Sequence, residues 1–315
     1  MVDRTTGTTS FNLDLNNLVE DAFERCGKEL RTGYDLRTAR RSLNLLTIEW
    51  ANRGINMWTV EPGQITLNQN QIMYALPSDT IDLLDMVTRT GTGSNQQDIN
   101  INRISESTYI TIPNKNATGR PIQVWINRQS GQENPTTITL NETLTATAST
   151  AANPETITLS STVGLAQFGF IKIGEETIQY GGVSGNTITG CIRAVNNTAL
   201  APHAISDKVY VQNLPTVNVW PTPEQSDFYQ FVYYRLRRIQ DGGTGVTVQD
   251  IPFRFIPCMV AGLAAYLSMK LPNVMPDRIA MLRADYEAAF QLAADEDREK
   301  APLRLVPRDM FYYRN

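Results

Sequence analysis

The chain has 315 residues, a formal net charge of −4, and hydrophobic and charged fractions of 41% and 19%. This length allows one large domain or two ordinary ones, and the composition excludes a disordered or fibrous protein. The acidic balance argues against a dedicated nucleic-acid binder, which needs an excess of Lys and Arg to neutralise phosphates.

Three cysteines, Cys26, Cys191 and Cys258, are spread along the chain. Their odd number and wide spacing predict buried thiols in a reducing cytoplasm rather than a disulfide framework or a zinc site. The first residues, MVDRTTGTTSFNLD, contain no apolar run and therefore predict no secretory signal. The most apolar run, residues 255–269, is shorter than the roughly 20 residues that a membrane span needs, and it predicts a buried helix.

Residues 1–57 are predicted to form a helical hairpin. Apolar residues recur at spacings of three and four over residues 15–30 and again over 36–50. Asp35 is the expected N-cap of the second helix, and Gly54 is expected to end it.

From residue 58 to 131 the pattern changes to short alternating runs that are typical of strands. QITL, QIMYAL and RPIQVWINR are the clearest of these runs, and IDLLDMV at 81–87 fits either a strand or a short helix. Alternation resumes over residues 215–245, in VNVWP and FYQFVYYRLRRI. Because VWIN and VNVWP resemble two halves of one sheet, the two stretches are predicted to form one β-domain.

Residues 132–214 differ from both flanks, because charge nearly vanishes while Thr, Ile, Val, Gly and Asn dominate. TITL occurs at 137–140 and again at 156–159. GFIKIG, ETIQYGG and NTITGCI are expected to be strands, with a tight turn at Gly185-Asn186. This segment is predicted to be an all-β module inserted into the β-domain.

Residues 246–300 are predicted to contain two helices, the second of which begins at Pro276. Residues 301–315 are expected to be an extended tail, since Pro302 and Pro307 exclude further helix. The predicted fold class is therefore α+β. It comprises a helical bundle, made of the N-terminal helical hairpin plus the two C-terminal helices, a β-sheet domain and an inserted all-β module.

The sequence predicts no enzyme, cofactor or metal site. Its only histidine, His203, has no G-x-S-x-G nucleophile elbow to act on, and we expect it to bond a neighbouring backbone carbonyl in a turn. Asp82 with Asp85, or Glu175 with Glu176, could form a carboxylate pair for glycoside hydrolysis, but adjacent carboxylates are more often a solvated edge. The glycine-rich TGTGS and DGGTGV lack a following Lys-Ser/Thr and a βαβ unit, which predicts ordinary loops.

Four arginines, Arg31, Arg37, Arg40 and Arg41, cluster on the hairpin away from its apolar stripe. They could contact phosphate, but no aromatic stacking residues interleave with them and the net charge is negative. We therefore expect them to form contacts between subunits.

The order of several sequence segments, called phrases below, resembles that in the head-to-tail adaptor of tailed bacteriophages, of the tail tubular protein A or gatekeeper type found in short-tailed phages. The phrases are LRTARRSLNLLTIEWANRGINMW, YALPSDTIDLLD, YITIPNKNATGRPIQVWINRQ, VNVWPTPEQ and DIPFRFIPCMVAGLAAYLSMK. The resemblance covers about residues 11–130 and 213–307. The inserted segment departs from it, and IGEETIQY, CIRAVNNTALAPH and DKVYV resemble a small β-module that recurs in phage structural proteins.

This resemblance implies a virion structural protein at the head–tail junction, made in the host cytoplasm and used in tail assembly and DNA ejection. It implies a ring of twelve subunits between the portal protein and the tail nozzle protein. Genomic DNA would pass through the bore without specific binding, and no membrane contact is implied. The alternative is a tail-associated protein whose inserted module binds a host glycan or another tail component.

The C-terminal tail is more apolar and aromatic than a solvated tail, since disordered ends are depleted in such residues. We expect it to dock onto the portal or a neighbouring subunit. The expected docking residues are Arg304, Arg308, Phe311, Tyr312 and Tyr313.

Overall fold

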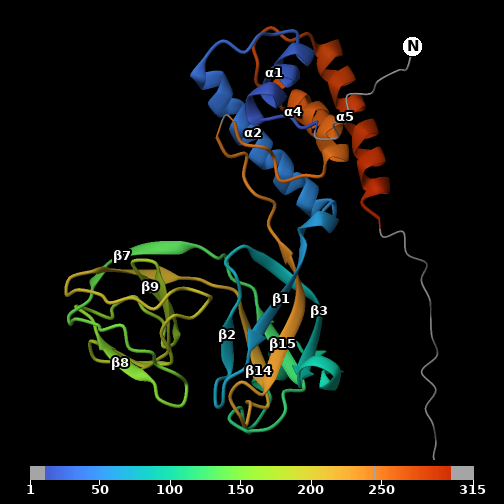
Figure 1. Cartoon of the computed structure of the whole chain (residues 1–315). Coiled ribbons are helices and arrows are strands. Elements are labelled where there is room, and N and C mark those ends of the chain that lie inside the picture. Colours follow the sequence, from blue (N-terminus) through green and yellow to red (C-terminus); the bar gives the residue numbers. More distant parts are fainter. Residues whose placement is uncertain (1–10, 245, 299–315) are drawn as a thin grey trace, which may run out of the picture. The chain divides into compact units, whose positions relative to one another are not determined.

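The computed structural model describes residues 11–244 and 246–298, and it divides into two compact units (Figure 1). The first unit joins the chain up to Trp58 with the chain from Ile239 onward, and the second is Thr59–Arg238. Helices make up the first unit and mainly antiparallel sheets the second, so the predicted α+β class is confirmed. None of the described helices is long and apolar enough to span a membrane.

The helical unit is built around one central helix, α4 (Ile256–Ser268), of whose 13 residues all but two are buried. It contacts α1 (Leu15–Arg25), α2 (Gly33–Asn52) and α5 (Pro276–Glu296), and the four helices share one hydrophobic core. Gly262 of α4 allows this close approach, because a Cβ there would lie 2.8 Å from the Leu46 side chain and 2.9 Å from the Tyr286 ring. The prediction of a buried helix over 255–269 is confirmed.

Helix α2 is capped at both ends, but its N-cap residue differs from the one predicted. Thr32, not Asp35, is the N-cap residue; Asp35 is the third helical residue and completes a capping box with Thr32. The expectation for Asp35 failed because both residues are good caps and the sequence alone did not place the helix start. Gly54 follows the C-cap with φ +88°, as expected for a terminal glycine.

Two sheets share the core of the β-domain. One has the order β1 (Val60–Thr66), β15 (Tyr229–Arg237), β3 (Thr80–Thr90) and β4 (Gln97–Asn100). The other has the order β2 (Met73–Ala75), β14 (Thr216–Trp220), β6 (Gln123–Asn127) and β5 (Asn102–Arg103). β14 pairs with β6, placing Val219 opposite Val124, which confirms that VWIN and VNVWP belong to one sheet.

Residues 81–87 lie within β3 and are therefore strand, one of the two structures that the sequence allowed. A short helix, α3 (Glu106–Ile110), was not predicted, because its five residues are too few to show a helical period. Single 3₁₀ turns occur at Met57–Thr59, Gly93–Asn95 and Phe253–Phe255.

The segment between β6 and β14 has its own core, formed by residues from Ile138 to Val209. One of its sheets has the order β10 (Glu176–Tyr180), β9 (Gly169–Ile173), β13 (Lys208–Gln212) and β7 (Glu133–Thr139). The other has the order β11 (Gly182–Ser184), β12 (Thr187–Cys191) and β8 (Glu155–Thr158). Gly185 and Asn186 form the two-residue turn between β11 and β12, as predicted. We call residues 132–212 of this segment the module.

The two ends of the module lie side by side. The Gly131 N–H donates to the Asn213 carbonyl at 2.8 Å, and the Asn213 N–H donates to the Gln132 carbonyl at 2.9 Å. Gly131 adopts φ +69°, and a Cβ there would lie 1.8 Å from the Ser78 carbonyl oxygen, so only glycine fits this position. The chain therefore leaves and re-enters the β-domain at one point.

We predict that residues 132–212 can be replaced by a short Gly/Ser linker without unfolding the rest of the chain. The ends are already hydrogen-bonded, and the cost of closing a loop changes only slowly with its length. The shortened protein should stay soluble, unfold cooperatively and retain its helical circular dichroism. Leu214 is buried and is kept in this variant. Aggregation, or loss of the helical signal, would show that the module supplies part of another core.

Candidate functional site

The structure separates the four arginines expected at a subunit contact. Arg37 and Arg41 are exposed on the outward side of α2, opposite the side that packs on α4. Arg31 is exposed before α2 and pairs with Glu29 at 3.0 Å. Arg40 is half-buried, its stem lies near Gly242, and its Nε is buried without a hydrogen-bond partner among the described residues. Only Arg37 and Arg41 therefore share one exposed face.

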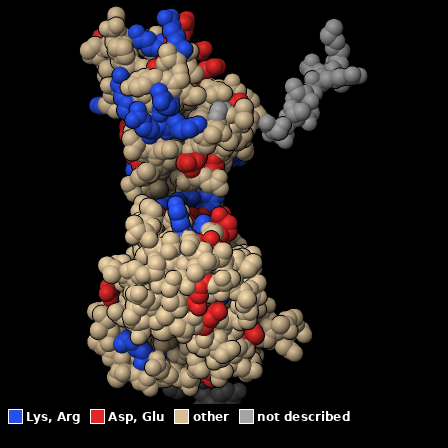
Figure 2. Space-filling view, turned by 90° about the vertical axis from the view of Figure 1, so that its left-hand side faces the viewer, with Lys and Arg blue, Asp and Glu red and all other residues tan. Residues whose placement is uncertain are grey.

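Figure 2 views the molecule from the side on which α2 lies in Figure 1, and shows Lys and Arg gathered over the helical unit. On the same view the module presents a surface with few charges. The tail residues Arg304, Arg308, Phe311, Tyr312 and Tyr313 lie outside the described residues.

Neither of the two carboxylate pairs that the sequence allowed is formed. Asp82 pairs with Arg103 at 2.9 Å and with Arg128 at 3.5 Å, while Asp85 is exposed. The Glu175 side chain is 96% exposed, as a solvated edge should be.

Glu176 contradicts the expectation of a solvated edge, because its side chain is fully buried. Its carboxylate accepts hydrogen bonds from the Arg193 Nε at 3.0 Å and Nη2 at 2.7 Å, and lies 2.7 Å from the His203 Nε2. The backbone N–H groups of Ala194 and Ala201 donate to it as well. His203 therefore bonds a buried carboxylate through its side chain, not the neighbouring carbonyl that we expected.

Glu176, Arg193 and His203 form what we call the buried triad of the module. Arg193 also donates to the carbonyls of Thr145 and Ala201, so the triad joins β10, the end of β12 and two loops. Burial by itself raises the pKa of the Glu176 carboxyl, but the hydrogen bonds from Arg193 and His203 outweigh that effect and hold the pKa below its ordinary value. The buried charges of Glu176 and Arg193 are therefore paired with each other.

Sequence reasoning missed the triad, although one signal for it was present. Arg193 is the only arginine in residues 132–214, and the nearest charged residues along the chain are Glu176 and Asp207. A lone charge in such a place must either reach the surface or find a buried partner, because unpaired buried charge is very costly.

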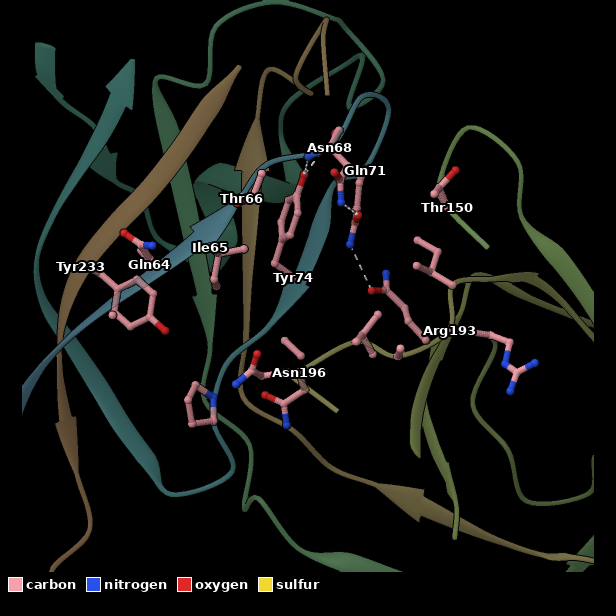
Figure 3. A pocket seen from close by; sticks show the side chains of 18 of the residues that line it. Gln64, Ile65, Thr66, Asn68, Gln71, Tyr74, Thr150, Arg193, Asn196 and Tyr233 are labelled. Atoms are coloured by element: carbon pink, nitrogen blue, oxygen red, sulfur yellow. Dashed lines mark hydrogen bonds between the residues drawn. The ribbon is translucent and has the colours of Figure 1, made fainter. Parts of the chain in front are cut away.

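A polar cleft of about 710 Å³ lies within the second unit, beside β1, β2 and the module segment that follows Cys191 (Figure 3). Six of its lining residues carry amide side chains: Gln64, Asn68, Gln71, Gln179, Asn196 and Asn197. Tyr74 and Tyr233 also line the cleft, and the Arg193 side chain points away from it toward the triad. Amides and phenols can bond uncharged polar ligands such as sugars.

No metal site is found in the part of the chain that the structure describes, where no group of three or more His, Cys, Asp or Glu side chains gathers. The three cysteines are free and buried, as the sequence predicts. Burial raises the pKa of the Cys26 thiol to about 11 and that of Cys191 to about 12.

We predict that Glu176→Gln destabilises the module by about 3–5 kcal/mol, because it leaves the Arg193 charge buried without a counter-ion. The matched control is Glu175→Gln at the exposed neighbour, which should have little effect. Amide hydrogen exchange of peptides from residues 132–212 measures both effects. Equal exchange in the two variants would contradict a stabilising role for the triad.

The same carboxyl should make the module acid-sensitive. A lowered pKa in the folded state means that the Glu176 contribution is complete above the ordinary value of 4.5 and is lost as pH falls through the folded-state value. The wild-type module should therefore lose protection below about pH 4.5. Glu176→Gln should lack this part of the pH dependence.

Comparison with known proteins adds no assignment to these observations. No family model matches the chain, and no curated protein matches it. Function is therefore inferred from the surfaces and sites described above.

Proposed function

We propose that this protein is a structural, non-catalytic head-to-tail adaptor of a short-tailed bacteriophage, assembled as a ring of twelve subunits between portal and tail nozzle. The ordered phrases that resemble such adaptors support the proposal. Helix α4 and the three helices packed around it, α1, α2 and α5, serve as the helical bundle of that architecture. Genomic DNA passes through the bore, and the net charge of −4 favours passage without tight binding.

One observation carries the proposal that subunits assemble through the helical unit. The outward side of α2 exposes large apolar side chains, Leu45 at 51% and Ile48 at 57%, in line with the exposed Arg37 and Arg41. A mixed apolar and basic surface on a packed helix is typical of a face that a partner covers.

A second candidate function is binding of a host glycan or another tail component through the module. The amide-lined cleft favours it, because such side chains recognise uncharged polar groups. Oligomeric state separates the two functions: an adaptor forms a ring, whereas a receptor-binding tail protein is usually a fibrous trimer.

We predict that the wild-type protein, mixed with the portal protein of its own virion, forms rings visible by negative-stain electron microscopy. Arg37→Glu with Arg41→Glu should prevent ring formation, because charges at an interface set register and association rate. The free energy of unfolding should stay within about 0.5 kcal/mol of wild type, since both side chains are exposed.

The charge-retaining control, Arg37→Lys with Arg41→Lys, should still assemble. Normal rings from the Glu variant would remove Arg37 and Arg41 from the interface while leaving the adaptor proposal intact. A fibrous trimer in place of a ring would favour the second candidate.

The C-terminal tail provides a separate prediction. We propose that it orders on the portal or a neighbouring subunit through Phe311, Tyr312 and Tyr313, with Arg304 and Arg308 pairing with acidic groups. Truncation after Lys300 should abolish portal binding in a pull-down and leave the melting temperature unchanged. Retained binding with a lowered melting temperature would instead mean that the tail packs on its own subunit.

A further inference from the structure

The outward side of α2 carries a regular row of exposed residues. Their spacing along the helix is three, four, four, three and four, which keeps them in one line because a helix turns every 3.6 residues. We call this row the α2 stripe: Tyr34, Arg37, Arg41, Leu45, Ile48 and Asn52.

A second exposed row runs along α5, on the side away from its buried Leu282, Tyr286 and Phe290. Met281 is 51% exposed and Leu292 is 75% exposed in this row. We call it the α5 stripe: Asp277, Met281, Asp285, Ala288, Leu292 and Asp295. Its spacing is four, four, three, four and three, so it repeats at nearly the same interval as the α2 stripe.

The two stripes carry opposite charges. The α2 stripe contains two arginines and no acidic residue, whereas the α5 stripe contains three aspartates and no basic residue. Neither Arg37, Arg41 nor Asp285 forms an ion pair with another residue that the structure describes. An α2 stripe facing a second α2 stripe would offer the two arginines no acidic partner, whereas the α5 stripe offers three aspartates. The charges therefore favour α2 against α5.

The direction of the two helices in one unit fixes how copies can meet. The Asp297 carboxylate, at the end of α5, accepts from the Asn56 N–H at 2.7 Å and the Met57 N–H at 3.2 Å, just beyond the end of α2. The Trp50 indole, near the end of α2, donates to the hydroxyl of Tyr286 in the middle of α5 at 3.1 Å. Both helices thus end at the same pole of the unit, and rotation about an axis along them brings α2 of one copy beside α5 of the next in the same direction.

Parallel alignment also gives the better match along the two rows. With Arg41 set opposite Asp285, it places Leu45 opposite Ala288 and Ile48 opposite Leu292, while Arg37 lies opposite Met281. Antiparallel alignment would instead place both arginines opposite apolar residues and Leu45 opposite Asp285. Apolar contact with complementary charges beside it is what a specific interface requires.

We infer that the α2 stripe of one copy packs in parallel against the α5 stripe of the next copy. Such a contact uses different surfaces on its two sides, so it propagates from copy to copy, and it forms a closed ring when the rotation between neighbouring copies completes a full turn. This inference rests on the proposed ring and specifies the two faces that build it.

Single-cysteine variants test the two faces directly. Leu45→Cys and Ala288→Cys each add one exposed thiol, while the three native cysteines are buried and provide a low background. The full-length proteins are mixed with the portal protein under conditions in which wild type forms rings and are treated with a short bifunctional maleimide, and the products are separated by denaturing electrophoresis. A mixture of the two variants should give a crosslinked dimer, each variant alone should stay monomeric, and the double variant should give a ladder of multimers.

Charge reversal provides a second test of the α2–α5 contact. Arg41→Glu or Asp285→Arg alone, in the double-cysteine background, should raise the concentration needed for half-maximal crosslinking at least about tenfold, and the two together should restore it. The control is Lys208→Glu, which reverses one exposed charge in the module and should change nothing.

The possible failures are distinguishable. Rings without any Leu45–Ala288 crosslink would overturn the inferred faces and leave the adaptor proposal standing. A crosslinked dimer from Leu45→Cys alone would show a symmetric α2 contact and would also overturn the inference. Absence of both rings and crosslinks would count against the proposed function as well.

Discussion

Antiparallel pairing of β1 with β15, which places Val60 opposite Leu236, is the constraint on which the organisation of the chain depends. It brings the two ends of the second unit together, so that residues before Trp58 and after Ile239 can complete one helical core. In the same way, backbone hydrogen bonds between Gly131, Gln132 and Asn213 hold the two ends of the module together. Each insertion begins and ends at one point, which explains why three separate cores form within a single chain.

Burial of α4 determines which surfaces the helical unit can offer to a partner. Because α4 occupies the centre, α2 and α5 each use one side to cover it and leave the other exposed. On their inward sides, α2 and α5 are joined by the hydrogen bond between Trp50 and Tyr286. The Arg53 guanidinium also lies 3.3 Å from the centroid of the Phe290 ring and pairs with Glu287. The exposed sides of α2 and α5 combine apolar and charged residues, which supports the proposed contact between subunits.

The face of the module seen in Figure 2 carries few charges, whereas its interior contains the buried ion pair of Glu176 and Arg193. The Glu176 carboxylate holds the Ala194 N–H at 3.1 Å, and this bond accompanies the left-handed backbone of Ala194, with φ +52°. Such a conformation is unfavourable for alanine and persists only when its surroundings fix it. The only histidine of the chain is therefore explained by packing, and the phrases IGEETIQY and CIRAVNNTALAPH meet in space at the triad.

The sequence by itself determined most elements and the position of the insertion. Helical spacing identified α1, α2 and α5, an uninterrupted apolar run identified α4, and alternation identified the main strands, because these signals are local and extend over many residues. Only the tertiary structure decided that Glu176 is buried while its neighbour Glu175 is exposed, since this depends on Arg193 and His203, which lie well beyond the local pattern. It also decided that Arg40 turns away from Arg37 and Arg41, and that the ends of α2 and α5, more than 230 residues apart, lie together. Such contacts arise from packing between distant segments, for which a local pattern contains no information.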